Sequence, residues 1–338
     1  MAELLPRAIT LAERPTLRTA LVPLLALSRL VRESGIKVVL TGEGADELFA
    51  GYDIFREDKI RRFWARDPAS TVRPALFRRL YAFLPRALPD NRLTQAFFRQ
   101  RLDETDHLLY SHLLRFANGA RASRVFRPTV AEPAAAGLLA ELEERQPATF
   151  ARFSPLARAQ YLEIATFLTG YLLHAQGDRM LMGHSVEGRF PYLDHRVAEF
   201  AAALPDRYRL AGLSEKHVLR RAAAGLVPDP IRLRRKHPFR APIGPVLAGP
   251  APPEYVGELL SSRSLERAGL FQREAVERLL TKARRHYGRD LTETEEMALV
   301  GVVSTMLLYE QYVADPPPPR SVEAQRLVTA PAEVAAGA

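Results

Sequence analysis

Three carboxylates and two glycines occur together in one short stretch of the chain, Thr41–Glu47 (TGEGADE). The stretch follows an apolar run at Ile36–Leu40, which predicts a short strand buried on both faces. It precedes residues that can begin a helix with acids in the first turn. A glycine turn between a strand and a helix start often binds phosphate, because the backbone can approach the anion and free N–H groups point at it.

The acidic side chains Glu43, Asp46 and Glu47 complicate this interpretation, since carboxylates repel phosphate. They fit beside phosphate if a divalent cation lies between them, or if one of them handles a substrate amine. A second interpretation needs no ligand, because acids also favour the dipole at the start of a helix. The pattern alone leaves both interpretations open.

The composition narrows the class of protein. A chain of 338 residues can form one large domain or two, and 47% hydrophobic with 26% charged residues is ordinary for a globular protein. The absence of cysteine excludes disulfides, thiolate metal sites and a cysteine nucleophile in this chain. No apolar run reaches the length of a membrane span, and the N-terminus lacks a signal-peptide pattern. We therefore expect a cytoplasmic protein with no membrane partner.

The formal net charge of +9 raises the possibility of nucleic-acid binding. The arginines are scattered, however, and no helical segment carries a sustained basic stripe. We therefore expect no nucleic-acid partner. A basic cleft would also suit anionic ATP and pyrophosphate.

Most of the remaining chain has helical periodicity. The longest helical pattern, Pro155–Met182, has a broad apolar face, and we expect Gly170 and Gly177 to interrupt it. Asp53–Arg66 predicts an amphipathic helix. The run Ala8–Leu11 is a candidate short strand.

The last part of the chain divides into a helix and a tail. Thr292 with Glu295 fits a capping box for a helix through Val313. Beyond it the composition turns to Pro, Ala and Glu, so residues 314–338 are expected to be a disordered tail.

The stretch TGEGADELFAGY (41–52) resembles the synthetase-domain motif of the class B, glutamine-hydrolysing asparagine synthetases, usually a variant of SGEGADELFGGY. Residues 177–205 (GDRMLMGHSVEGRFPYLDHRVAEFAAALP) and 215–242 (EKHVLRRAAAGLVPDPIRLRRKHPFRAP) resemble later stretches of that family in order and spacing. The resemblance extends from about Glu3 to Val313. Two departures, Thr41 for Ser and Ala50 for Gly, remove no chemical group that the motif needs.

The resemblance implies an α/β fold of the adenine-nucleotide α-hydrolase-like type (the PP-loop ATP pyrophosphatases), with a parallel sheet that is incomplete here and dominated by helices. Buried parallel strands need neighbours on both sides, and we expect the strands that should flank Ile36–Leu40 to be absent from this chain. Neither the family's upstream pyrophosphate loop, SGGxDS, nor its N-terminal glutaminase domain is found. We therefore expect residues 1–313 to be a partial synthetase domain, with Met1 at an internal point of a longer enzyme, and to be inactive alone.

The reaction implied by the resemblance is the ATP-dependent amidation of aspartate to asparagine through a β-aspartyl-AMP intermediate. ATP and Mg²⁺ would be the cofactors, and glutamine would supply ammonia. The missing glutaminase and PP-loop segment would be a partner, in the same or a separate chain, and a homodimer is possible. Two alternatives stay open: a related amide- or β-lactam-forming synthetase of secondary metabolism, and a non-catalytic fragment or subunit that needs a partner chain.

The motif positions imply roles for residues of the glycine turn. Thr41, Gly42 and Gly44 would bind ATP. Glu43 would be the acid required for forming the aspartyl-adenylate. Asp46 would ligate Mg²⁺, sharing it with the aspartate of the absent SGGxDS loop, whereas Glu47 would be structural.

The two later motifs imply further site residues. Lys236 matches the lysine that stabilises charge on the α-phosphate and pyrophosphate, a task suited to a compact ammonium. Lys216 also occupies a motif position, in a secondary role. Asp178 and Arg179 could bind the ammonium and carboxylate of an amino-acid substrate, or could equally form ion pairs that brace helix ends.

Overall fold

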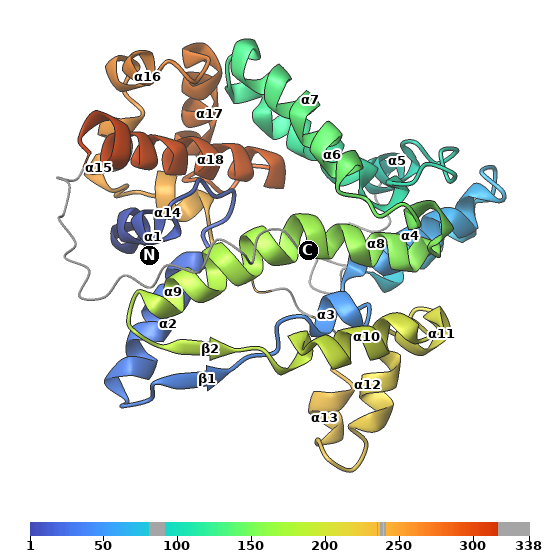
Figure 1. The fold of residues 1–338 in the computed structure, drawn as a ribbon. Helices are drawn as coiled ribbons and strands as arrows, with labels where there is room; N and C mark the ends of the chain where they lie inside the picture. The colour runs from blue at the N-terminus through green and yellow to red at the C-terminus, as the bar shows by residue number, and fades with distance from the viewer. Residues whose placement is uncertain (81–91, 235, 237–238, 240, 317–338) are drawn as a thin grey trace, which may run out of the picture.

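The computed structural model describes residues 1–80, 92–234, 236, 239 and 241–316 (Figure 1). Helices dominate this part of the chain, together with two three-residue strands, β1 (Val38–Leu40) and β2 (Glu187–Arg189). The α-helices are α1 (Leu5–Ala12), α2 (Leu21–Glu33), α3 (Ala45–Leu48), α4 (Asp53–Ala65), α5 (Arg92–Arg99), α6 (Leu113–Ala122), α7 (Pro128–Glu144), α8 (Pro155–Glu163), α9 (Arg179–Met182), α10 (His195–Ala203), α11 (Asp206–Arg209), α12 (His217–Ala222), α13 (Asp229–Arg232), α14 (Gly244–Ala248), α15 (Glu254–Leu259), α16 (Ser262–Ala268), α17 (Arg273–Arg285) and α18 (Glu293–Tyr309).

The two strands form a small parallel sheet, in which Val38 pairs with Glu187 and Leu40 with Arg189. The strand expected at Ile36–Leu40 is therefore confirmed in its core. The expectation that no neighbouring strand exists in the chain is wrong, because β2 is one. The expectation of burial on both faces is also wrong, since Val38 is 44% and Leu40 73% exposed. The faces of a parallel sheet are buried by helices packed on them, and no described segment covers the face from which Val38 and Leu40 project.

The candidate strand at Ala8–Leu11 is wrong, because these residues lie in helix α1. Pro6 occupies the first turn of this helix, where a missing N–H costs nothing. The buried positions follow a helical spacing: Leu5, Ala8, Ile9 and Ala12. A four-residue window was too short to show this period.

One long helical rod crosses the molecule above the sheet, as Figure 1 shows. It consists of α8, a π-helical segment at Ile164–Asp178, and α9. The expected helix over Pro155–Met182 is confirmed, but Gly170 and Gly177 do not interrupt it. Both glycines lie inside the π-helical segment, and the helix continues through them into α9.

The largest apolar core lies around α18, against α1, α2 and α17. The capping box of Thr292 and Glu295 is present at its start. Among the described residues, Glu293–Ala314 is the one span long and apolar enough to cross a membrane. Half of its apolar window is buried, and Val300, Val302 and Met306 are fully enclosed. The span is the central core helix of this fold.

Helix α4 matches the expected segment Asp53–Arg66, but it is not amphipathic. Arg61 is completely buried and donates hydrogen bonds to the carbonyl oxygens of Phe98 (3.2 Å) and Gln100 (2.7 Å). Charged groups on both sides of the helix are thus enclosed by neighbouring segments. These contacts fix the helix that directly follows the TGEGADE turn.

The outcome for the fold class is a mostly helical α/β protein with a small parallel sheet. We predicted a disordered tail over residues 314–338. Residues 317–338 of that tail lie outside the described residues.

Candidate functional site

The TGEGADE turn begins where β1 ends. The backbone N–H of Thr41 donates to the carbonyl oxygen of Arg189 (2.9 Å), so pairing with β2 sets the start of the turn. The Thr41 hydroxyl is buried and has no hydrogen-bond partner. The helix that follows, α3, has only four residues. Its dipole is correspondingly small, and the free backbone N–H groups of the turn are the better anion donors.

Gly44 cannot be replaced without strain. Its φ of 89° lies in the left-handed region, and a Cβ there would lie 2.2 Å from Leu193 Cδ2. Leu193 lies in a short 3-10 helix soon after β2, so the turn packs against the segment that follows the second strand. The requirement for glycine is therefore local and steric.

We predict that Gly44→Ala destabilises the chain by at least about 2 kcal/mol, from the left-handed backbone and the overlap with Leu193. Gly119→Ala in α6 is the matched control, because its Cβ would meet nothing within 4 Å and alanine favours a helix. Urea unfolding of the two variants and the parent chain measures the difference. Equal midpoints for Gly44→Ala and the parent chain would contradict the steric account.

Asp46 lies between two lysines that come from distant segments. Lys216 Nζ is 2.8 Å from Asp46 Oδ1, and Lys236 Nζ is 3.0 Å from Oδ2. Lys236 is 190 positions further along the chain. The structure thus brings the first and third sequence motifs together at one carboxylate.

Gly51 makes room for this contact. A Cβ at position 51 would lie 2.0 Å from Asp46 Oδ1 and 2.2 Å from Lys216 Cε. The N–H of Gly51 also donates to the Asp46 carbonyl oxygen (2.7 Å). Ala50, where glycine is commoner in the family motif, adopts a left-handed φ of 57°. The loop after α3 therefore wraps closely around the lysine–carboxylate pair.

Glu43 is half-buried beside this group. Burial raises the pKa of Glu43, the nearby Lys236 and Lys216 oppose that rise, and Asp46 adds to it. Together with Thr41, Glu43 lines a cavity of about 230 Å³ between α2, β1 and the long helical rod. Most of the other lining side chains are apolar. Glu43 thus contributes a carboxyl group to the lining of a mainly apolar pocket.

Glu47 is not among the residues that line this cavity, and it is fully buried. Tyr52 donates to Glu47 Oε1 (2.6 Å), and Gln160 donates to the carbonyl oxygens of Glu47 (2.6 Å) and Leu48 (2.9 Å). Burial raises the pKa of both Glu47 and Tyr52. These bonds tie the turn to α8 and support the structural role expected for Glu47.

Asp178 and Arg179 are not among the residues that line the cavity beside Glu43. Arg179 pairs with Glu13 at the end of α1 (2.8 Å) and donates to His174 (3.3 Å). The cavity is lined instead by Gln176 and Gly177, which directly precede Asp178 in the chain. The contacts of Arg179 favour the alternative in which it braces a helix end.

Asp46 is the candidate ligand for a magnesium ion at this site. Among the described residues, no group of three or more His, Asp or Glu side chains could hold a metal. Mg²⁺ beside nucleotide phosphates usually takes only one or two protein carboxylates, and water and phosphate oxygens supply the rest. Asp46 Oδ1 is buried and ion-paired with Lys216 Nζ at 2.8 Å, and a carboxylate oxygen has further lone pairs that can bind a cation. Asp46 therefore fits the role of a single protein ligand.

Lys216 is more central than its motif position suggested. Its backbone is left-handed (φ 50°, ψ 36°), and its N–H donates to the Phe49 carbonyl oxygen (3.0 Å). This geometry directs the side chain onto Asp46. No local sequence pattern encodes it, because lysine rarely adopts this conformation.

Comparisons with known proteins show the family to which the chain belongs. The family model described as asparagine synthase matches residues 1–309, and the chain therefore belongs to the asparagine synthase family. The chain is 28% identical over 244 residues to asparagine synthetase [glutamine-hydrolyzing] 1 of Bacillus subtilis, covering 71% of this chain and 36% of that protein. It is 32% identical over 243 residues to a Mycobacterium tuberculosis protein with the provisional name of asparagine synthetase, covering 71% and 35%.

Another relative has a different name. The chain is 28% identical over 273 residues to "Amidase chry2" of Gibberella zeae, covering 75% of this chain and 39% of that protein. In each case the matched region spans little more than a third of the relative's length. The family is thereby shown for the region that carries the Asp46–lysine cluster.

Proposed function

We propose that this chain is the nucleotide-activating part of an amide-forming ligase that converts aspartate to asparagine with ATP. The observation that carries the proposal is the meeting of Asp46, Lys216 and Lys236 beside the glycine turn. A carboxylate that can hold Mg²⁺, flanked by two ammonium groups, is an arrangement that neutralises phosphate charge. Membership of the asparagine synthase family supports the same class of reaction.

In the proposed reaction the side-chain carboxylate of aspartate attacks the α-phosphate of ATP. Pyrophosphate leaves and β-aspartyl-AMP forms; ammonia then attacks the acyl carbon and AMP leaves with the carboxylate oxygen. Magnesium, when bound at Asp46, would neutralise charge on the phosphate oxygens. The turn from Thr41 to Gly44 would hold the nucleotide through backbone N–H groups and the buried hydroxyl.

Each charged side chain of the cluster has a task in this scheme. Lys236 would stabilise the charge that develops as pyrophosphate departs, and Lys216 would hold the other side of the phosphate group. Glu43 faces the cavity next to Asp46, where it would orient the incoming substrate and accept a proton from ammonia. These roles remain proposals about a complete enzyme.

The sheet supports the proposal that a further segment completes the site. In the described part of the chain β1 pairs only with β2, which leaves the other edge of β1 without a paired strand. A parallel strand added at the free edge of β1 would end beside Thr41, because parallel strands share their carboxyl ends. We propose that the segment bearing the pyrophosphate loop and the glutaminase domain supplies this strand, in the same chain or a partner.

A second candidate is the activation of a different carboxylic acid. The likeness to amidase chry2, and to "Amidase chyE" of Penicillium rubens at 30% identity over 281 residues, favours it. The Asp46–lysine cluster acts on ATP and would be unchanged in such an enzyme. The acid-binding part of the site would then differ from that of an asparagine synthetase.

Formation of AMP by the native gene product tests the two candidates. The product should be purified through a C-terminal tag, so that any upstream segment or partner chain remains attached. We expect AMP and pyrophosphate with ATP, Mg²⁺, an ammonia source and aspartate, and little with glutamate or β-alanine. AMP formed only with another acid would establish the second candidate. Absence of AMP with every acid would support a non-catalytic chain.

A further inference from the structure

Arg220, in helix α12, contacts both segments that carry the two lysines. Its guanidinium donates to the carboxylate of Glu215, which directly precedes Lys216. The same group donates to the carbonyl oxygens of Leu233 (3.2 Å) and Arg234 (3.1 Å), just before Lys236. One planar fork therefore joins the two chain segments whose side chains meet at Asp46.

Glu215 is anchored from a second direction. Its side chain is buried, and Arg56 Nη1 of helix α4 lies 3.5 Å from its other oxygen. Arg56 in turn pairs with Asp53 at the start of the same helix. Because α4 directly follows the loop around Asp46, Glu215 is fixed relative to the carboxylate that its neighbour Lys216 contacts.

The backbone at this point needs such support. Lys216 is held in the left-handed region, which costs a residue with a Cβ about 1 kcal/mol or more. A further hydrogen bond joins α13 to α12, because Arg232 of α13 donates to the Arg220 carbonyl oxygen (3.0 Å). Hydrogen bonds and ion pairs of buried or half-buried arginines thus hold the segment from Glu215 to Arg234 together.

We propose that Arg220 and Glu215 are positioning residues that deliver Lys216 and Lys236 to the two oxygens of Asp46. Neither residue touches the proposed substrate site; they act through the two lysines. The catalytic consequence rests on the proposed function, since two ammonium groups stabilise developing charge only if they are already in place. The structural consequence, the placement of the two lysines, can be measured without any activity.

The variant Arg220→Lys tests the inference. A lysine keeps the charge, but a single ammonium cannot reproduce the planar fork that reaches a carboxylate and two carbonyl oxygens. Arg221→Lys, on the exposed face of the same helix, is the matched control. Glu215→Gln, which keeps the shape of the side chain and removes its charge, is the second variant if Arg220→Lys does not fold.

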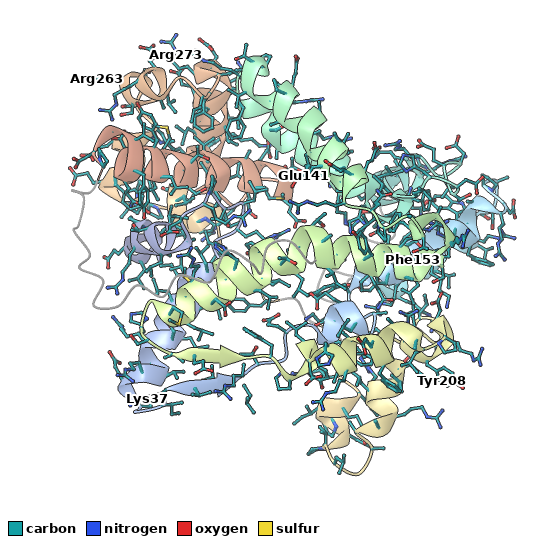
Figure 2. All side chains as sticks on the ribbon, viewed as in Figure 1. Lys37, Glu141, Phe153, Tyr208, Arg263 and Arg273 are labelled. Atoms are coloured by element: carbon teal, nitrogen blue, oxygen red, sulfur yellow. The ribbon has the colours of Figure 1, made fainter. Side chains whose placement is uncertain are left out.

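The first measurement is the reactivity of each lysine toward trace acetic anhydride, read by peptide mass spectrometry. The sequence has only five lysines, so each is followed separately. Lys37, at the outer end of β1 in Figure 2, and Lys282, paired with Glu295 on the surface, serve as internal references. We expect the rates at Lys216 and Lys236 to rise several-fold in Arg220→Lys and to stay unchanged in Arg221→Lys. Unchanged rates at both lysines would overturn the inference.

The second measurement is the rate of AMP formation by the native gene product. We expect Arg220→Lys to lower kcat about tenfold or more with little change in the KM for ATP, since misplaced ammonium groups affect the transition state most. Normal kcat with altered lysine reactivity would remove the catalytic part of the inference. If the parent enzyme forms no AMP, the proposed function fails, and the lysine reactivities alone decide the positioning role.

Discussion

Glu43→Gln is expected to abolish aspartate-dependent exchange of pyrophosphate into ATP, lowering the rate about 10³-fold or more. The substitution keeps the size of the side chain and removes its charge and its capacity to accept a proton. Glu43 is half-buried at a mainly apolar cavity and lies near Lys236 and Lys216. With a neutral amide at this position, no negative charge from residue 43 would offset the charge of the two ammonium groups. The substrate would also lack an acid to orient it.

Glu187→Gln is the control for this experiment. Glu187 belongs to β2, is exposed, and pairs with Arg189 on the surface (2.8 Å). We expect its exchange rate to match that of the parent enzyme. Retention of exchange by Glu43→Gln, with both variants folded as judged by circular dichroism, would remove Glu43 from the reaction.

Lys236→Ala is expected to lower the rate of adenylation about 10²- to 10³-fold, the usual cost of removing one electrostatic contact to the transition state. Lys236 Nζ lies 3.0 Å from Asp46 Oδ2 and 5.5 Å from the centre of the Tyr52 ring. The ammonium is therefore held at the edge of the proposed phosphate site and remains partly accessible. Its loss should lower kcat and kcat/KM equally, because the charge it opposes develops mainly in the transition state.

Lys282→Ala provides the matched control, since this lysine forms a surface ion pair with Glu295 (2.7 Å). Its adenylation rate should equal that of the parent enzyme. Lys236→Arg should recover only part of the rate, because the larger guanidinium cannot occupy the same position between Asp46 and Tyr52. An unchanged kcat in Lys236→Ala would show that the lysine is not part of the charge-stabilising group.

The local parts of the site were predictable from the sequence. The apolar run before Thr41 and the glycine turn give the strand and the helix start, because both depend on neighbouring residues. The capping box at Thr292 is another local feature that the sequence contains in full.

The second strand was not predictable in the same way. Glu187–Arg189 is short and polar, unlike a buried parallel strand. Its pairing with β1 depends on the long helical rod that returns the chain to the same place. Leu40 is 73% exposed because its side chain projects from a face of the sheet that no described segment covers.

The contact of Lys216 with Asp46 depends on the fold as a whole. The sequence placed Lys216 in a family motif but gave it a secondary role. Its position follows from a left-handed backbone and from buried ion pairs with Arg56 and Arg220, which are contacts between distant segments. Arg179 shows the opposite outcome, because its pairing with Glu13 holds it at the end of α1.

Transfer of ¹⁸O from aspartate to AMP tests the central claim most directly. The native gene product is supplied with ATP, Mg²⁺, an ammonia source and aspartate labelled with ¹⁸O in its side-chain carboxylate, and the AMP is analysed by mass spectrometry. The account predicts one ¹⁸O atom in the phosphate of each AMP, because the carboxylate oxygen that attacks the α-phosphate leaves with AMP. Unlabelled AMP, or the formation of ADP and phosphate instead, would contradict it.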